Sequence, residues 1–200
     1  MALPPGFVSI DPIRHRAALV GRVIDQRTQD PLANATVEIT DAPAAYKARL
    51  ATLRQGRPAA RPDVIATGDG GVFRWLDLPA GTYTLRASLA DTRYAVATIT
   101  ATVVPAAPVF ADLALAPTTL TGSVLADNPA GPLGMARIRV RDSGEVAFTG
   151  PDGSFSLSPI EPGAARVIEF SAQRYATATR TVTLQRGQTT TSPAITLLHS

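Results

Sequence analysis

The sequence predicts an all-β protein made of two tandem seven-stranded β-sandwiches, the first with a short helical insertion. Three observations lead to this prediction: the chain repeats itself, apolar residues alternate with polar ones, and turn-forming dipeptides recur at short intervals. Short strands with a period of two, separated by turns, are typical of sandwiches and barrels. With 200 residues, of which 45% are hydrophobic, the chain has room for two small cores.

The internal repeat covers most of the chain. Residues 19–40 align with residues 120–141 at an offset of 101 residues. Further along, residues 67–81 align with residues 149–163 at an offset of 82 residues. The first copy therefore contains 19 residues that the second copy lacks. A repeat of this kind predicts two structural units of the same fold.

Within each copy the apolar residues follow the period of a half-buried strand. Tyr83 and Leu85, for example, alternate with Thr82, Thr84 and Arg86. In the first copy we expect strands near residues 17–24, 35–40, 63–67, 72–76, 82–89, 94–104 and 109–115. In the second copy we expect strands near residues 119–126, 136–141, 145–149, 154–158, 164–171, 176–184 and 192–198.

These strands define the expected domain organisation. An extended N-terminal arm over residues 1–16 precedes a first sandwich over 17–117, and a second sandwich follows over 118–200. The additional residues of the first copy form an insertion at about 42–62. The short segment 115–118 contains a proline, so it should join the two sandwiches into a fairly stiff rod.

The motifs of the repeat carry a family resemblance. Each copy has Gly-x-Val, then Pro-Leu-x-x-Ala-x-Val/Ile, then Gly-x-Phe, then Leu/Ile-x-x-Gly, and finally an isolated tyrosine, Tyr94 or Tyr175. This pattern, which extends over nearly all of 17–198, resembles the carboxypeptidase regulatory-like domain. The second copy departs from it at Ala165, where the first copy has Tyr83.

The resemblance implies a transthyretin-like (prealbumin-like) sandwich with the general Ig-like architecture. Such domains are usually accessory modules rather than catalytic ones, and they occur on secreted enzymes, surface proteins, transporter plugs and phage-tail-like particles. A shared fold does not by itself determine a function.

The residue types that catalysis and metal binding need are scarce. The chain has no cysteine, and its two histidines, His15 and His199, stand at opposite ends of the sequence. Asp69 and Asp152 precede or adjoin glycines in turns, where too few acids are present for a calcium site. The only lysine, Lys47, lies in the insertion, which argues against a Lys–Asn isopeptide crosslink. We therefore expect no enzyme activity, no cofactor and no metal.

The charge and hydropathy of the chain limit the classes of partner that we expect it to bind. The formal net charge is +3 and the pI is about 9.8, but aromatic residues make up only 6% and the basic residues are not concentrated as in nucleic-acid-binding proteins. No apolar run is long enough to span a membrane, and no signal peptide is recognisable. We expect protein partners, no nucleic acid and no small-molecule ligand. Synthesis in the cytoplasm is expected, with a place in a particle that is released from or attached to the cell.

The insertion is the first candidate partner-binding element. A helix is expected over about 44–55, because alanine and leucine dominate there and no β-branched run interrupts them. Tyr46, Leu50 and Leu53 fall on one face of this helix, whereas Arg54 lies elsewhere. Two interpretations remain open: the helix caps its own sandwich, or it binds a partner.

The second candidate is an arginine strip on one strand. Arg137, Arg139 and Arg141 occupy alternate positions, so all three should project from the same face. The first copy has Thr36, Glu38 and Thr40 at these places, so the fold does not require the arginines. The strip is either a solvated face neutralised by acids such as Glu145 or Glu169, or a docking surface for an anionic partner.

These features favour a non-catalytic structural or interaction protein that serves as a peripheral or adaptor component of a larger multi-protein assembly. A phage-tail-like or contractile injection particle is the example that we consider. The alternative is a carbohydrate-binding or cell-surface adhesion module. That alternative needs an exposed aromatic platform, and the sequence leaves open whether Trp75 is exposed or packs in the core.

Overall fold

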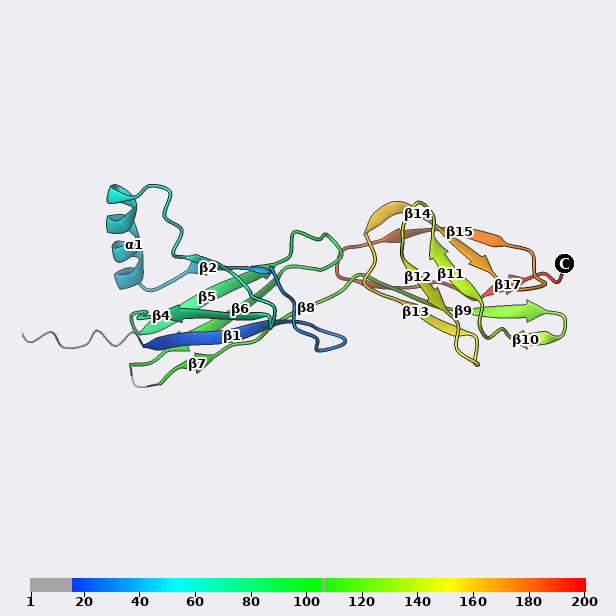
Figure 1. The fold of residues 1–200 in the computed structure, drawn as a ribbon, viewed down its shortest axis with the longest axis horizontal. Coiled ribbons are helices and arrows are strands. Elements are labelled where there is room, and N and C mark those ends of the chain that lie inside the picture. Colours follow the sequence, from blue (N-terminus) through cyan, green and yellow to red (C-terminus); the bar gives the residue numbers. More distant parts are fainter. Residues whose placement is uncertain (1–15, 106) are drawn as a thin grey trace, which may run out of the picture.

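The computed structural model describes residues 16–105 and 107–200. Two β-sandwiches lie end to end along the long axis of the molecule, and one helix stands at the far end of the first sandwich (Figure 1). The arm expected over residues 1–16 lies outside the described residues, apart from Arg16. Below, "first sandwich" means residues 17–117 and "second sandwich" means residues 118–200.

The first sandwich consists of two sheets. Strand β1 is central in one sheet, with β4 antiparallel on one side and β7 and β8 parallel on the other; the second sheet has the order β3-β2-β5-β6. The elements are β1 (Ala17–Asp25), β2 (Thr36–Asp41), α1 (Ala44–Gly56), β3 (Val64–Ala66), β4 (Val72–Leu76), β5 (Gly81–Ser88), β6 (Ala97–Val103), β7 (Val109–Phe110) and β8 (Leu113–Leu115).

The second sandwich repeats this arrangement. Strand β9 takes the place of β1, with β13 and β10 as antiparallel partners and β16 and β17 as parallel ones; the other sheet has the order β12-β11-β14-β15. The elements are β9 (Thr119–Asp127), β10 (Ala130–Pro132), β11 (Arg137–Val140), β12 (Val146–Phe148), β13 (Ser154–Leu157), β14 (Gly163–Ser171), β15 (Ala178–Leu184), β16 (Thr189–Thr191) and β17 (Ile195–Leu197).

The strand count differs from the expected seven in each copy, because the described residues form eight strands in the first sandwich and nine in the second. The final strand is divided in two each time. In the first sandwich the division falls at Ala111 and Asp112, where the Asp112 carboxylate accepts the Arg22 backbone N–H at 2.8 Å. The chain also passes very close to Gly21 here: a Cβ atom at this glycine would lie 1.9 Å from the Ala111 carbonyl oxygen. The hairpin strand β10 is a further element that the sequence did not predict.

The buried apolar residues form two separate clusters, one in each sandwich. Each cluster is bounded by a buried threonine with the same bonding. The Thr67 hydroxyl accepts the Ala35 N–H at 2.9 Å and donates to the Leu32 carbonyl at 2.7 Å. Thr149 makes the same pair of bonds in the second sandwich, at 2.8 and 2.6 Å. The repeat in the sequence is thus a repeat of buried hydrogen bonds as well.

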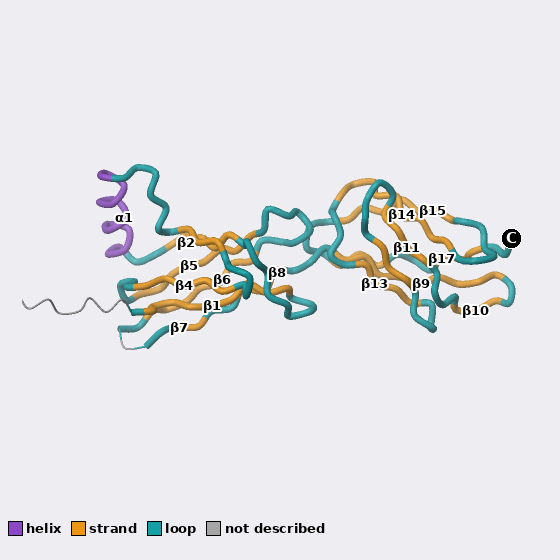
Figure 2. The backbone as a smooth tube through the Cα atoms, in the orientation of Figure 1, coloured by secondary structure: helices purple, strands orange, loops and turns teal. Residues whose placement is uncertain are grey.

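The segment between the sandwiches is bonded on both sides. In the first sandwich, Ala95 N–H donates to the Ala116 carbonyl at 2.8 Å, and Thr118 N–H donates to the Arg93 carbonyl at 2.7 Å. In the second sandwich, Ile160 N–H donates to the Thr118 carbonyl at 3.0 Å. Figure 2 shows this short connection as loop between the two strand-rich bodies. These bonds connect the backbone of the segment to both sandwiches.

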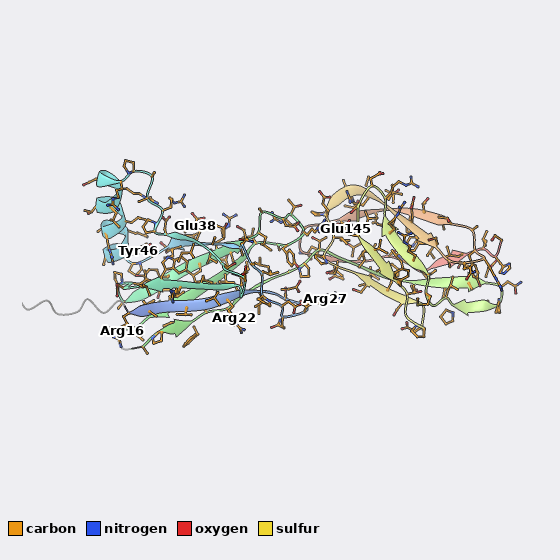
Figure 3. All side chains as sticks on the ribbon, in the orientation of Figure 1. Arg16, Arg22, Arg27, Glu38, Tyr46 and Glu145 are labelled. Carbon is orange, nitrogen blue, oxygen red and sulfur yellow. The ribbon has the colours of Figure 1, made fainter. Side chains whose placement is uncertain are left out.

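Side chains add further contacts across the junction. Arg93 reaches Glu145 with an Nη2–Oε1 distance of 3.3 Å, and the Glu145 side chain is only 8% exposed. Arg186 donates through Nε to the Tyr94 carbonyl. Arg27 of the first sandwich donates to the Ser156 hydroxyl of the second at 3.1 Å. Figure 3 shows Arg27 and Glu145 on either side of the junction.

Candidate functional site at helix α1 and the arginine strip

Helix α1 begins at Ala44, directly after Pro43, and ends at Gly56. Pro43 is the N-cap residue and no side chain caps the helix; the Pro43 carbonyl accepts the N–H groups of Tyr46 and Lys47. The helix therefore starts where the proline fixes φ near the helical value. The Asp41 carboxylate instead pairs with Lys47 at 2.7 Å.

Tyr46, one of the candidate partner-binding residues, lies in the core of the first sandwich. It is 6% exposed, and its ring meets the Tyr83 ring edge-on with centroids 5.7 Å apart. Leu50 is half-buried against the same cluster. Both residues anchor the helix to the sandwich, as the capping interpretation predicts for this part of the helix. Of the three apolar residues on the predicted face, only Leu53 is exposed, at 41%.

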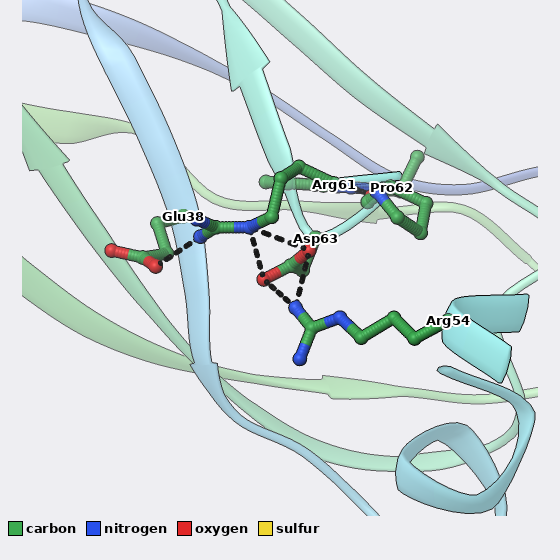
Figure 4. Close-up of polar contacts among 6 residues, drawn as sticks. Glu38, Arg54, Arg61, Pro62 and Asp63 are labelled. Carbon is green, nitrogen blue, oxygen red and sulfur yellow. Dashed lines mark hydrogen bonds and ion pairs between the residues drawn. The ribbon is translucent and has the colours of Figure 1, made fainter. Parts of the chain in front are cut away.

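An ion cluster fixes the outer end of the helix. The buried Asp63 carboxylate accepts N–H groups from Arg54 at 3.2 and 3.3 Å and from Arg61 at 3.3 Å (Figure 4). Arg61 also donates to Glu38 of strand β2 at 2.8 Å. Arg54, a candidate partner-binding residue, is therefore engaged within the chain, and the cluster ties helix, connecting loop and sheet together.

The charges of this cluster shift the pKa of Asp63. Burial on its own would raise the pKa of this carboxyl group, but the hydrogen bond from Arg61 and the positive charges of Arg61 and Arg54 hold the pKa below its usual value. Burial also raises the pKa of Tyr46, and the nearby Asp63 charge adds to this effect. At neutral pH, Asp63 is therefore ionised and Tyr46 neutral.

A polar cleft of about 490 Å³ opens between helix α1 and strand β2. Its charged lining is balanced, and most of it is paired within the chain: Asp41 with Lys47, and Asp63 with two arginines. No group of three or more potential metal-ligating side chains exists within the described part of the chain. The ion pairs in the cleft therefore stabilise the position of the helix on the sandwich. Its lining residues are Glu38, Ile39, Thr40, Asp41, Ala42, Tyr46, Lys47, Leu50, Arg54, Arg61 and Asp63.

A second, smaller hollow lies on the other side of the helix. This apolar slot, of about 120 Å³, is lined by residues of helix α1 and strand β4, together with Pro62 and Leu78. Leu53 and Leu76, which are 41% and 43% exposed, stand at its opening. The slot residues are Tyr46, Arg49, Leu50, Leu53, Pro62, Trp75, Leu76 and Leu78.

Trp75 packs in the core. It is 5% exposed, it meets Phe73 edge-on with centroids 5.6 Å apart, and its indole N–H donates to the Pro62 carbonyl at 2.9 Å. The indole ring therefore forms the floor of the apolar slot and offers no open face for stacking a sugar ring.

The arginine strip is partly neutralised by one carboxylate. Arg139 and Arg141 both bind Glu169 of strand β14, at 2.6 and 2.9 Å. Hydrogen bonds from Arg139 and then Arg141 hold the pKa of Glu169 below its usual value. Arg137 is exposed and lies opposite Phe148, which is also exposed, on strand β12. The charges of Arg139 and Arg141 are therefore neutralised by a cross-strand acid, as one of the two interpretations holds. Arg137 is left as the candidate docking residue of the strip.

The sequence did not mark the residues that join the sandwiches: Glu145 was considered only as an acid that neutralises the arginine strip, whereas it pairs with Arg93. Arg93 meets Glu145, and Arg186 meets the Tyr94 carbonyl, only in the folded chain, and no local spacing marks these contacts. Gly187 could have been noticed as one member of an Arg-Gly turn before strand β16, since glycine tolerates the left-handed backbone that it adopts here, with φ of +68°.

The comparison with protein families decides the nature of the second sandwich. Residues 119–198 match the family model for the carboxypeptidase regulatory-like domain. The resemblance inferred from the motifs is thereby confirmed for this part of the chain. The matched stretch runs from the start of strand β9 to the residue after strand β17. It therefore includes the arginine strip and one side of the junction.

Among solved structures, the chain is similar to the TIE protein of Bacillus anthracis, at 12% identity and a TM-score of 0.44, over 92% of this chain and 34% of that one. It is similar to the shaft pilin SpaA of Lactobacillus rhamnosus GG, at 13% identity and a TM-score of 0.43, over 94% of this chain and 98% of that one. It is also similar to the minor pilin GBS52 of Streptococcus agalactiae, at 14% identity and a TM-score of 0.35, over 91% and 95%. No curated protein matches the sequence.

Within the described residues, α1 is the only helix, and it is too short and too polar to cross a membrane.

Proposed function

We propose that this chain is a non-catalytic interaction protein that acts as a rigid spacer or adaptor in a larger multi-protein assembly. The observation that carries the proposal is the junction between the sandwiches. Its backbone is bonded to both bodies through Ala116 and Thr118, and the Arg93–Glu145 and Arg186–Tyr94 contacts hold it from the sides. Contacts of this kind on both sides of the connection support a role in keeping two surfaces at a fixed distance and angle.

The two surfaces that such a spacer would present lie on different sandwiches. Helix α1 stands at the end of the first sandwich that is remote from the junction, and Arg137 lies on a sheet of the second (Figure 1). A rigid body that carries one binding surface on each unit can position two partners relative to each other. The place of the chain in a phage-tail-like or contractile particle, and its release from or attachment to the cell, remain predictions with no further support.

The alternative of a carbohydrate-binding or adhesion module is less well supported by the residues. The largest aromatic side chain, Trp75, is buried, and the exposed Phe110 and Phe148 lie on different sandwiches. A sugar-binding strip usually needs several exposed aromatic rings close together. The proposal of a spacer requires no such strip.

Rigidity can be measured directly, because the chain has no native cysteine. Cysteines introduced at the exposed Thr100 and Thr181, one on each sandwich, would carry spin labels. Pulsed electron paramagnetic resonance should give one narrow distance distribution for the full chain. A distribution as broad as that of two freely linked domains would overturn the spacer proposal.

Assembly can be measured in the source cell. A tagged full-length chain, expressed at its native level and purified under mild conditions, should elute in a complex that contains defined amounts of other proteins. If the chain elutes as a monomer at low ionic strength in every growth condition tested, then the proposed role in an assembly is wrong.

A further inference from the structure

We infer that the apolar slot beside helix α1 is a docking site for an acidic segment of a protein partner, which inserts one apolar side chain between Leu53 and Leu76. This inference rests on the proposed interaction function, because it names the kind of partner that the first sandwich would take. Three properties of the slot support it: its origin in the insertion, its preformed walls and the charge around it.

The slot exists only because of the insertion. The helix and Pro62 form one side of it, and the second sandwich, which lacks the insertion, completes its fold without an equivalent. The buried Tyr46 and the half-buried Leu50 already account for the packing of the helix on the core. The exposed Leu53 adds less to that packing, and together with Leu76 it places apolar surface at the slot, where another molecule can contact it.

The walls of the slot are fixed before any partner arrives. Asp63 holds the helix end through Arg54, and the Trp75 indole is held by its bond to the Pro62 carbonyl. Arg49 reaches across the slot and donates to the Asp77 carbonyl at 3.0 Å. A partner would therefore meet a preformed hollow, and little conformational freedom would be lost when it binds.

The charge around the slot indicates an acidic partner. The segment from Asp41 to Asp63 has five basic and two acidic residues, a formal charge of +3, which equals the net charge of the whole chain. Arg57 directly follows the helix, and Arg74 lies on the outer face of strand β4 two positions from Leu76. Both are exposed, and within the described residues neither guanidinium group forms a hydrogen bond or ion pair.

The size and composition of the slot limit the kind of partner segment that it can bind. A volume of about 120 Å³ suits a single leucine, isoleucine or phenylalanine side chain, not a folded surface. Guanidinium groups on both sides can take carboxylates in a bidentate way. A nucleic acid would be held by the cations alone and would gain little from the two leucines. A short acidic segment with one apolar anchor uses both features.

A peptide selection tests this inference with the full-length chain. A phage-displayed library of random peptides would be selected on the immobilised protein and counter-selected on the double variant Leu53→Ser/Leu76→Ser. Because both leucines are substantially exposed, the variant should keep the melting temperature of the wild type. The selected peptides should combine one large apolar residue with acidic neighbours.

The selected peptide, made synthetically, supplies the quantitative readout. It should bind the double variant at least about tenfold more weakly than the wild type, because the anchor loses its apolar contacts. Binding to Arg57→Gln/Arg74→Gln should be weaker and less sensitive to salt. The variant Arg86→Gln, which removes an exposed arginine from the opposite sheet, is the matched control and should bind normally.

Several results would overturn the inference. These are a selection that yields no peptide with a preference for the wild type, selected peptides without acidic residues, and equal binding to the leucine variant. A single-stranded oligonucleotide that binds equally well to the leucine variant would instead mark a surface for polyanions. If the native complex in the source cell survives the leucine substitutions, then only the slot inference fails. If no complex exists even for the wild type, the proposed function fails as well.

Discussion

Gly187 of the second sandwich lies so close to Ala95 of the first that a Cβ atom at Gly187 would stand 2.2 Å from the Ala95 Cβ atom. Gly187 also adopts φ of +68°, a left-handed backbone conformation that favours glycine. Its N–H group donates to the Thr118 hydroxyl at 2.8 Å, so the same residue contacts both the first sandwich and the connecting segment. A single glycine is therefore one of the points on which the angle between the sandwiches depends.

Replacing this glycine should loosen the junction. In Gly187→Val, the clash with Ala95 and the strain of a β-branched residue at positive φ should separate the two surfaces. We expect the distance distribution between spin labels at Thr100 and Thr181 to broaden or shift, while the circular dichroism of the strands is retained. Gly131→Val is the control, because its Cβ would meet no atom within 4 Å. Equal distributions for the two variants would contradict this role of Gly187.

The second sandwich should fold alone. Its cluster of buried residues is separate from that of the first sandwich, so residues 118–200 keep their own core when the junction is cut. Expressed alone, this fragment should melt in one cooperative transition, at a lower temperature than in the full chain, because the contacts of Glu145 and Gly187 are lost. A fragment without a cooperative transition would mean that the sandwiches depend on each other to fold.

The ion pairs between the arginine strip and Glu169 should be detectable in the titration of Glu169. The pKa of Glu169 is lowered by Arg139 and Arg141, so the double variant Arg139→Gln/Arg141→Gln should bring it back toward the usual value of a glutamate. Arg137→Gln, the control, should leave it unchanged, because the ion pairs of this carboxylate are with Arg139 and Arg141 and not with Arg137. Carbon-detected nuclear magnetic resonance of the carboxyl group measures the pKa. An unchanged value in the double variant would show that the pairs do not form in solution.

Two tyrosines that touch each other should respond differently to loss of their hydroxyl groups. The Tyr46 hydroxyl is buried and has no hydrogen-bond partner, whereas the Tyr83 hydroxyl donates to the Pro79 carbonyl at 2.8 Å. Tyr46→Phe should leave the free energy of unfolding unchanged or raise it by up to about 1 kcal/mol, while Tyr83→Phe should lower it by about 1 kcal/mol. Urea unfolding of both variants checks this. Equal destabilisation would mean that the Tyr46 hydroxyl has a partner in solution.

Acid should weaken the attachment of helix α1. Because the pKa of Asp63 is lower in the folded than in the unfolded chain, its stabilising effect is present above about pH 4 and is lost as the pH falls through the folded value. Melting temperatures of the wild type should therefore fall more steeply below pH 4 than those of Asp63→Asn. At pH 7 the variant should be less stable by roughly 1–3 kcal/mol, since Arg54 and Arg61 lose their charged acceptor. Parallel curves for the two proteins would contradict the role of this ion cluster.

Much of the fold could be predicted from the sequence, because a strand that is half-buried shows its period of two locally. Strand β4 was predicted at its observed bounds and β1 within one residue. The expected strand at 94–104 begins only at Ala97, because Tyr94 bridges to Pro117 beside the junction. Strands β10 and β16 were missed: each has only three residues, too few to show a period of two, and β10 consists of Ala-Gly-Pro, residues that are depleted in strands.

The candidate site was less predictable, because its geometry depends on contacts between distant residues. The helical period placed Tyr46, Leu50 and Leu53 on one face, but only the tilt of the helix on the sandwich determines which of them is buried. Likewise, nothing in the spacing of the sequence tells that Asp63 becomes the shared acceptor of two arginines. Charge pairing across a loop needs the loop conformation, and this does not follow from composition.

The parallel pairing of the first and last strands of each sandwich has a mechanical consequence. Strand β1 runs beside β8, and β9 runs beside β17, in the same direction. Tension between Arg16 and Leu198 would pull the members of each pair in opposite directions along their length, so the hydrogen bonds between them would bear the load together. Bonds that must rupture together resist force better than bonds that open one at a time, and forced unfolding depends on that barrier. A pull on one end of the molecule would thus pass through both sandwiches to the other end with little extension.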